Sequence, residues 1–278
     1  MACLICCLPR SGSWLLAQGL RGTGHVGRPE EYFWEFLRPF YARRWGLPAS
    51  VAQPRFLSAA VRAGTTPNGV FGAKVHWFQM RQLIGRLRAL PRSDGLPWRS
   101  LIEQAFRTPR YVRLMRQDKV RQAISYHRAI ETGVWWKGLR PTARTADASP
   151  DVDYDHVEYL EGVLTRHEEE WTRFFAISGI TPLLVTYEEL CVNYQGVIRR
   201  VLRDTGANVP RRIRIDPPPM EKQANHRATD RIVHEYISRQ RLAKPVEDTP
   251  LGMRPDALRA PHDGHLNSHS GWWRGAYT

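Results

Sequence analysis

A short apolar run that turns directly into a small polar loop constrains the fold of this chain more than any other feature. Residues 2–7 read ACLICC, residues 8–13 read LPRSGS, and apolar residues return at 14–16. This order predicts a buried strand, a tight loop and a helix. The backbone N–H groups of such a loop and of the first helical turn attract an anion. We therefore expect an α/β protein with an anion site beyond its first strand.

Strand-like and helix-like segments alternate along the rest of the chain. Further strands are predicted at 70–75, 111–115 and 182–185, and helices at 12–21, 77–90, 118–135, 153–178, 188–205 and 229–240. Residues 29–63 are expected to be irregular or partly helical. Strands separated by helices indicate a central parallel sheet flanked by helices on both faces, which is a three-layer sandwich. Ligands of such sheets bind beyond the carboxyl ends of the strands, which here are the segments 9–14, 74–77 and 116–118.

The charge of the chain favours anionic partners. Its 278 residues include 41 Lys and Arg against 27 Asp and Glu, a net charge of +14. Nucleic acid, a membrane surface and a phosphorylated small molecule all suit such an excess. No apolar run approaches the roughly 20 residues of a membrane helix, and the apolar start is too short for a signal peptide. We expect a cytoplasmic protein with a folded part at 1–241 and a loosely ordered tail at 242–278.

The four cysteines favour buried thiols over a disulfide framework or a metal site. Cys3, Cys6 and Cys7 stand in the first apolar run, and Cys191 stands alone. Cys3 and Cys6 form a CxxC pair, but no second pair completes a zinc site. In a strand, Cys3 and Cys7 share one face and Cys6 takes the other. With no HExxH or other strong metal spacing, the sequence predicts no metal.

The residues of the opening loop are suited to phosphate. Arg10 can bind a phosphate through two N–H donors, Ser11 and Ser13 offer hydroxyl groups, and Gly12 allows a close backbone approach. A Walker loop is excluded, because its second glycine and its lysine are absent. A phosphatase loop that begins at Cys7 is excluded too, because it requires an arginine where Ser13 stands. Taken alone, the loop is equally compatible with an ordinary strand–helix turn.

A second pair of polar residues follows the third predicted strand. Arg116 stands at its end, and Ser125 lies nine residues further on, inside the next helix. Together they could hold a second phosphate away from the first, although taken alone they are better explained as a surface arginine and a helix serine. Two phosphate sites at two strand ends suit a nucleotide with phosphates on separate ribose positions.

With these pieces together, the sequence resembles the sulfotransferases, and more closely the bacterial trehalose 2-sulfotransferase family. The matching stretches keep their order from residue 2 to about 240, and the tail from 242 has no counterpart. The resemblance is carried by Arg10-Ser11-Gly12-Ser13, Leu15-Leu16, Thr23-Gly24, Gly27-x-Pro29-x-Glu31-x-Phe33, Thr66-Pro67-Asn68-Gly69-Val70-Phe71-Gly72-x-Lys74, Gln122-Ala123-x-Ser125, Arg128-Ala129, Thr132-Gly133-Val134-Trp135 and Gln223-Ala224.

The resemblance implies the sulfotransferase fold, a P-loop-like α/β sandwich, with 3′-phosphoadenosine 5′-phosphosulfate as the sulfuryl donor. The 5′-phosphosulfate loop of the family is matched by Arg10, Ser11, Gly12, Ser13 and Trp14. Its 3′-phosphate site is matched by Arg116 and Ser125. Such loops commonly carry a hydroxyl residue where this chain has Trp14, which removes one hydroxyl contact and leaves the backbone N–H of Trp14 in place.

Two residues are candidates for the base that takes the proton of the acceptor hydroxyl. Glu31 resembles the glutamate base of the trehalose family, and His76 resembles the histidine base of cytosolic sulfotransferases. We assign Glu31 as the base and His76 as the alternative. Lys74 and Arg10 are assigned to the charge that develops on the leaving phosphate. We expect burial among the aromatic residues 32–34 to raise the pKa of Glu31.

The resemblance further implies a sugar or glycoside as acceptor and a homodimer, with no nucleic-acid or membrane partner. Aromatic side chains near the candidate segments suit a sugar or a packed core, and they are Trp34, Trp77, Trp135 and Trp136. Two alternatives stay open. One is a sulfotransferase-like protein that binds nucleotide without catalysis, for which Trp14 is the visible reason, and the other is a basic nucleic-acid-binding protein.

Overall fold

A parallel sheet lies at the centre of the molecule. The computed structural model describes residues 1–135, 152–206, 210, 213–218 and 226–243. Within these residues, each pairing in the sheet is parallel and the strand order is β2-β1-β3-β4. The strands are β1 (Ala2–Cys7), β2 (Phe71–His76), β3 (Pro109–Met115) and β4 (Leu183–Thr186). The first strand is therefore central, and its loop opens between its two neighbours.

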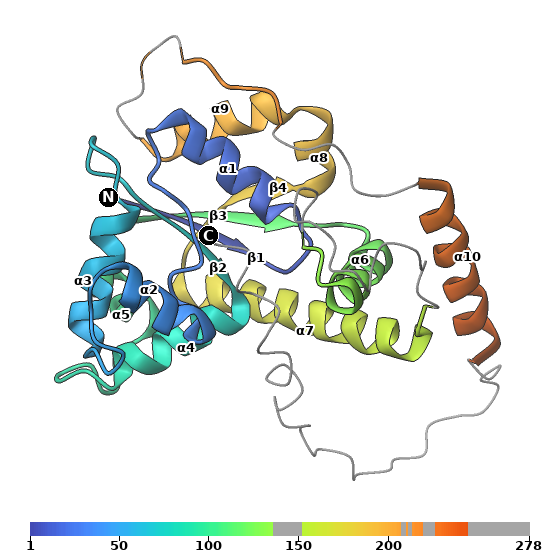
Figure 1. Cartoon of the computed structure of the whole chain (residues 1–278), viewed down its shortest axis with the longest axis horizontal. Coiled ribbons are helices and arrows are strands. Elements are labelled where there is room, and N and C mark those ends of the chain that lie inside the picture. Colours follow the sequence, from blue (N-terminus) through green and yellow to red (C-terminus); the bar gives the residue numbers. More distant parts are fainter. Residues whose placement is uncertain (136–151, 207–209, 211–212, 219–225, 244–278) are drawn as a thin grey trace.

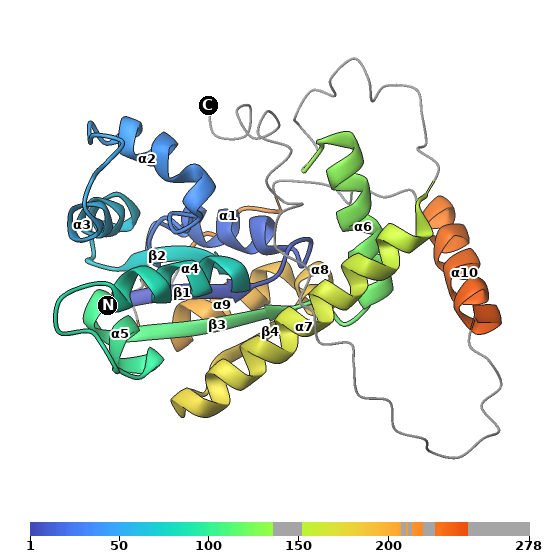
Figure 2. The ribbon, with the colours of Figure 1, turned by 90° about the horizontal axis from the view of Figure 1, so that it is seen from below.

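Helices cover both faces of the sheet and complete three layers (Figures 1 and 2). One face carries α1 (Ser13–Thr23), α8 (Tyr187–Val192) and α9 (Tyr194–Asp204). The other face carries α4 (Trp77–Arg88), α5 (Trp98–Ala105) and α7 (Tyr154–Ser178), with η1 (Glu35–Leu37), α2 (Arg38–Arg44) and α3 (Gln53–Gly64) nearby. Beyond the carboxyl ends lie α6 (Lys119–Thr132) and α10 (His226–Ala243).

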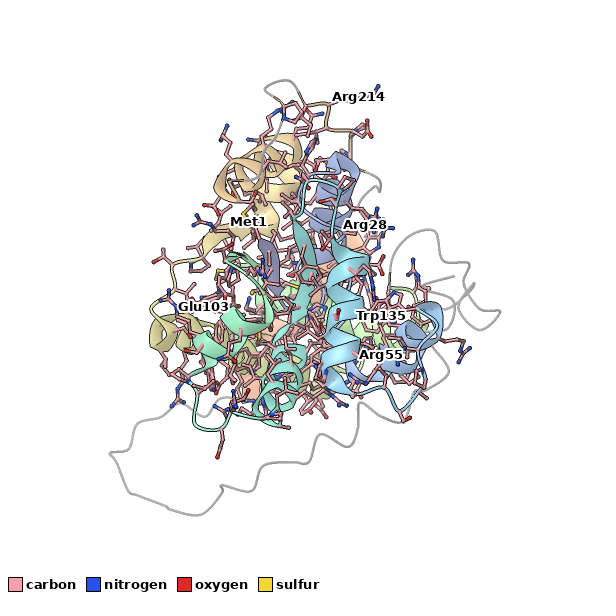
Figure 3. All side chains as sticks on the ribbon, turned by 90° about the vertical axis from the view of Figure 1, so that its left-hand side faces the viewer. Met1, Arg28, Arg55, Glu103, Trp135 and Arg214 are labelled. Atoms are coloured by element: carbon pink, nitrogen blue, oxygen red, sulfur yellow. The ribbon has the colours of Figure 1, made fainter. Side chains whose placement is uncertain are left out.

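The core divides into two apolar clusters, one on each face of the sheet. Cys3, Ile5 and Cys7 pack into the cluster with α1 and α9, whereas Leu4 and Cys6 pack into the cluster with α4, α5 and α7. The predicted alternation of the cysteines in β1 is thus confirmed. None of the four cysteines, all of which the structure describes, forms a disulfide. Arg28, Arg55 and Arg214, which are labelled in Figure 3, are exposed.

The predicted elements are confirmed with three differences. The helix expected at 188–205 is two helices, because Asn193 leaves the helical conformation at φ −133° and its side chain accepts the N–H of Gly196 to cap α9. The helix expected to reach 135 ends at Thr132, because Gly133 adopts a left-handed conformation at φ 66°. The short helix α5 was not expected. The tail expected from 242 lies outside the described residues from 244 onward, and α10 continues to Ala243.

None of the described helices is long and apolar enough to cross a membrane.

Candidate functional site

The opening loop has the backbone geometry of an anion cradle. Arg10 adopts a left-handed conformation at φ 60°, and Gly12 follows at φ 82° as the N-cap of α1. A Cβ atom on Gly12 would lie 2.7 Å from the ring of Tyr187, so both conformation and space require glycine here. The N–H groups of the first turn of α1, which begins at Ser13, have no partners inside the helix. They are donors at the mouth of the loop.

Side chains of α6 and of Arg116, which follows β3, hold this loop in place. Gln122 donates to the carbonyl of Pro9 at 2.7 Å. The guanidinium of Arg10 donates to Oγ of Ser125 at 3.0 Å, and Arg116 donates to the carbonyl of Arg10 at 3.3 Å. The structure therefore brings Arg10, Arg116 and Ser125 together into one cationic cluster beside the opening loop.

The two arginines of this cluster are partly buried. Burial, with the nearby charge of Arg116, lowers the pKa of Arg10 to about 10, so it stays charged at neutral pH. The guanidinium of Arg116 lies 4.6 Å from the centre of the Tyr187 ring, and its Nε is buried with no hydrogen-bond partner among the described residues. A buried guanidinium with an unsatisfied N–H is suited to an incoming anion.

Ser11 does not present its hydroxyl to a ligand as expected. The residue is fully buried, and its Oγ donates to the carbonyl of Leu8 at 2.7 Å. The hydroxyl closes the turn and is not available as a donor in this state.

The second cluster forms where an irregular segment pairs with β2. Glu30 forms a parallel bridge with Ala73, and the N–H of Lys74 donates to the carbonyl of Glu30 at 3.0 Å. This pairing sets the next residue, Glu31, beside the side chains of β2. Nζ of Lys74 lies 2.6 Å from the Glu31 carboxylate, and Nε2 of His76 lies 3.6 Å from it.

The ionisation of this cluster differs from the expectation. Burial alone raises the pKa of Glu31, but the charges and hydrogen bonds of Lys74 and His76 outweigh it and hold the pKa well below its usual range. The expected rise of this pKa was therefore wrong. Burial opposes the charged form of His76, but Cys7 and Glu31 outweigh burial and raise its pKa to about 9. At neutral pH the cluster holds a carboxylate between two cations.

Sequence reasoning missed several residues that position these groups. They are Cys7, Gln79 and Tyr187. Gln122 was named for the resemblance, but without its role in holding the loop. The sulfur of Cys7 lies 3.5 Å from Nδ1 of His76, because the register of β1 and β2 pairs the two residues. Gln79 carried a signal, since a glutamine at the third helical position after a strand end is typical of a capping box.

Gln79 connects both base candidates. It is fully buried, accepts the N–H of His76 at 3.0 Å and donates to the Glu31 carboxylate at 2.6 Å. We expect Gln79→Leu to lower kcat by about tenfold or more with little change in donor affinity, because a hydrogen bond to a charged group is lost. Steady-state kinetics check this, with the exposed Gln104→Ala as control. An unchanged kcat in Gln79→Leu would remove Gln79 from the positioning of Glu31.

The four tryptophans fall into different environments. Trp77 packs in the core against Trp171. Trp34 packs against Phe78, which stacks on His76. The carbonyl of Trp135 accepts a hydrogen bond from Arg10, and Trp136 lies outside the described residues.

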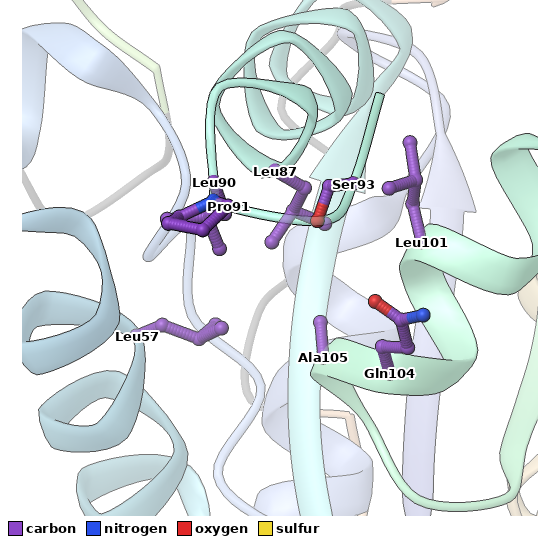
Figure 4. A pocket seen from close by; sticks show the side chains of 8 residues that line it. All are labelled: Leu57, Leu87, Leu90, Pro91, Ser93, Leu101, Gln104 and Ala105. Atoms are coloured by element: carbon purple, nitrogen blue, oxygen red, sulfur yellow. The ribbon is translucent and has the colours of Figure 1, made fainter. Parts of the chain in front are cut away.

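A cavity of about 220 Å³ lies elsewhere in the fold (Figure 4). It lies near the end of α4 and the end of α5, toward the amino end of the sheet. Its lining is mostly apolar and consists of Leu57, Leu87, Leu90, Pro91, Ser93, Leu101, Gln104 and Ala105. The described residues of its wall include no titratable side chain.

A cationic loop and an acid–base cluster at one edge of a parallel sheet characterise an α/β group-transfer enzyme. The model of the Stf0 sulphotransferase family matches residues 2–240, and the chain belongs to that family. It is a sulfotransferase with the α/β sulfotransferase fold.

Two curated relatives have similar sequence identity to this chain. The chain is 30% identical over 265 residues to the trehalose 2-sulfotransferase of Mycobacterium tuberculosis strain Erdman, covering 87% of this chain and 95% of that one. It is 29% identical over 273 residues to the trehalose 2-sulfotransferase of Mycolicibacterium smegmatis, covering 90% and 98%. The solved sulfotransferase domain from the curacin biosynthetic pathway is similar with a TM-score of 0.43 and 16% identity, over 82% of this chain and 81% of that one.

Proposed function

We propose that the chain transfers a sulfuryl group from 3′-phosphoadenosine 5′-phosphosulfate to a hydroxyl of a sugar or glycoside. The observation that carries the proposal is the buried Glu31 carboxylate. It is held between Lys74 and His76 at the end of β2, next to the strand that leads into the cationic loop. A base and a phosphate cradle on adjacent strands suit an in-line transfer between two bound partners.

The donor binds across the opening loop in this proposal. Its 5′-phosphosulfate lies at the N-terminus of α1 and contacts the backbone of residues 12–14. Arg116 and Ser125 bind its 3′-phosphate. The support is the cluster itself, in which Arg10, Arg116 and Ser125 already contact one another, and the unsatisfied Nε of Arg116.

In the chemical step one bond forms, one bond breaks and one proton is transferred. The acceptor oxygen attacks sulfur, and the bond between sulfur and the bridging oxygen of the 5′-phosphate breaks. The electron pair of that bond stays on the leaving adenosine 3′,5′-bisphosphate, where Arg10 and Lys74 stabilise the charge. The proton of the acceptor hydroxyl goes to Glu31.

Lys74 links the two halves of this step. While its ammonium lies against Glu31, the carboxylate is a weak base, because its pKa is held low. When the ammonium turns to the leaving phosphate, Glu31 loses a nearby positive charge and its pKa rises. The base therefore strengthens as the leaving group is stabilised.

The acceptor proposal rests on the relatives and on aromatic surface. Both curated relatives are named for trehalose, and the partly exposed Trp34 packs against Phe78, which stacks on His76. An aromatic face packs well against the C–H edges of a sugar ring. We further propose that the enzyme is cytoplasmic and, on the resemblance alone, that it acts as a homodimer.

Calorimetric titration tests the donor, and labelled transfer tests the acceptor. We expect adenosine 3′,5′-bisphosphate to bind at least about tenfold more tightly than AMP or ATP, because a specific phosphate contact is charge-assisted. Labelled donor should then sulfate trehalose or a trehalose glycoside. Equal or absent binding of all three nucleotides would reject the donor site, and steep salt dependence with long polyanions would favour the nucleic-acid alternative.

A further inference from the structure

A third cluster of titratable side chains lies where the end of α6 meets the start of α7. His127 and Glu131 belong to α6, and His156 belongs to the first turn of α7. One nitrogen or oxygen of each of the three residues lies within 4.8 Å of the others. The two helices pack against one another in both views of the ribbon (Figures 1 and 2). The reaction described above uses none of these residues.

The two imidazoles face each other through the same nitrogen. Nδ1 of His127 lies 3.1 Å from Nδ1 of His156, and the rings are nearly perpendicular at 86°. His127 is 1% exposed, and its Nε2 has no hydrogen-bond partner among the described residues. Because the rings meet through Nδ1, the two Nδ1 atoms are the nitrogens that a shared ion would contact.

The distance between the two nitrogens also matches two ligands of one metal ion. With Zn–N bonds of about 2.0–2.1 Å, tetrahedral geometry separates two ligand nitrogens by about 3.3 Å. The observed separation of 3.1 Å is within about 0.2 Å of that value. Asp153 accepts the N–H of His156 at 3.0 Å, which fixes the start of α7 and with it the position of the second imidazole.

We propose that His127, Glu131 and His156 bind a divalent transition-metal ion, with zinc as the best match. Two imidazoles and one carboxylate suit zinc and its neighbours, whereas calcium and magnesium prefer oxygen ligands throughout. His127 and Glu131 stand four residues apart on one helix and share a face. Glu131 is exposed, so water has access to the fourth ligand position.

The ion would act on structure and not on the transfer step. It would join the end of α6 to the start of α7. The same helix carries Gln122 and Ser125, which hold the opening loop, so an ion at this site would also stabilise the helix that supports the donor cradle.

Titration of the chelator-treated full chain with Zn²⁺ and Co²⁺ tests the proposal. We expect one Zn²⁺ per chain by calorimetry, the visible absorption of four-coordinate Co²⁺, and a higher Tm with zinc. His156→Ala and Glu131→Gln should each weaken binding by at least about tenfold, since even the partners of metal ligands have effects of that size. These two positions are chosen because His127 is buried and its replacement could impair folding.

Three controls separate this site from other groups that bind zinc. His234→Ala removes an exposed histidine of α10, Cys191→Ser removes a partly exposed thiol, and a triple alanine variant removes His262, His265 and His269 of the tail. All three should bind zinc as the unmodified chain does. Absent binding, or binding that His156→Ala and Glu131→Gln leave unchanged, would overturn the proposal. The readout depends on neither donor binding nor sulfate transfer.

Discussion

Glu31→Gln lowers the rate of sulfate transfer by about 10²–10⁴-fold and leaves the affinity for adenosine 3′,5′-bisphosphate within about threefold of the unmodified chain. The amide has the shape of the carboxylate and keeps an oxygen for Lys74, which lies 2.6 Å from Glu31. It cannot take the proton of the acceptor hydroxyl. Single-turnover transfer of labelled sulfate measures the rate, and calorimetry measures the affinity.

Glu30→Gln is the matched control. Glu30 is the neighbour of Glu31, and its carboxylate pairs with Arg21 and Arg44 away from the cluster. Its replacement should leave transfer within about threefold, because partly exposed ion pairs contribute little. Near-normal transfer in Glu31→Gln would move the role of base to His76 or remove it. A lowered Tm with weakened nucleotide binding would instead indicate that the variant is misfolded, so both quantities are measured first.

The pH dependence of kcat/KM separates the two base candidates, because they predict different profiles between neutral pH and about pH 9. With Glu31 as base, the carboxylate is ionised throughout the neutral range and kcat/KM is flat there. It falls above about pH 9, where His76 loses the charge that balances the cluster. With His76 as base, only its neutral form is active, so kcat/KM rises steadily toward about pH 9. We expect the flat profile with an alkaline fall, and the rising profile would contradict Glu31.

The sequence predicts the cradle well because its signals are local. The change from apolar residues to LPRSGS and back specifies strand, loop and helix within 15 positions. The strand ends that carry Arg116 and Lys74 follow from similarly short apolar runs. The alternation of Cys3, Cys6 and Cys7 in the central strand needs only the period of two that every strand has.

The second cluster depends on contacts between distant segments. Glu31 stands in a segment with no regular pattern, and it reaches Lys74 only because Glu30 pairs with β2. The local sequence pattern predicts neither that pairing nor the register that sets Cys7 beside His76. The pKa of Glu31 was misjudged for the same reason, since burial was visible in its neighbours but the two facing cations were not.

Arg116→Ala weakens the binding of adenosine 3′,5′-bisphosphate by about 10- to 150-fold, the effect of losing a hydrogen bond to a charged group. The guanidinium stands over Tyr187 and has a buried N–H without a partner among the described residues. Calorimetry measures the loss. Arg110→Ala is the control, because Arg110 lies on β3, the strand that precedes Arg116, and its side chain is exposed. This variant should bind the nucleotide normally.

The same variant distinguishes a phosphate ligand from a support of the loop. Arg116 also donates to the carbonyl of Arg10, so its loss could loosen the cradle without removing a phosphate contact. AMP lacks the 3′-phosphate and reports on the cradle alone. If Arg116 binds the 3′-phosphate, Arg116→Ala weakens the binding of the bisphosphate and leaves the binding of AMP nearly unchanged. The preference for the bisphosphate over AMP then disappears. If the affinities for both nucleotides fall equally, Arg116 only positions the loop, and another residue must bind the 3′-phosphate.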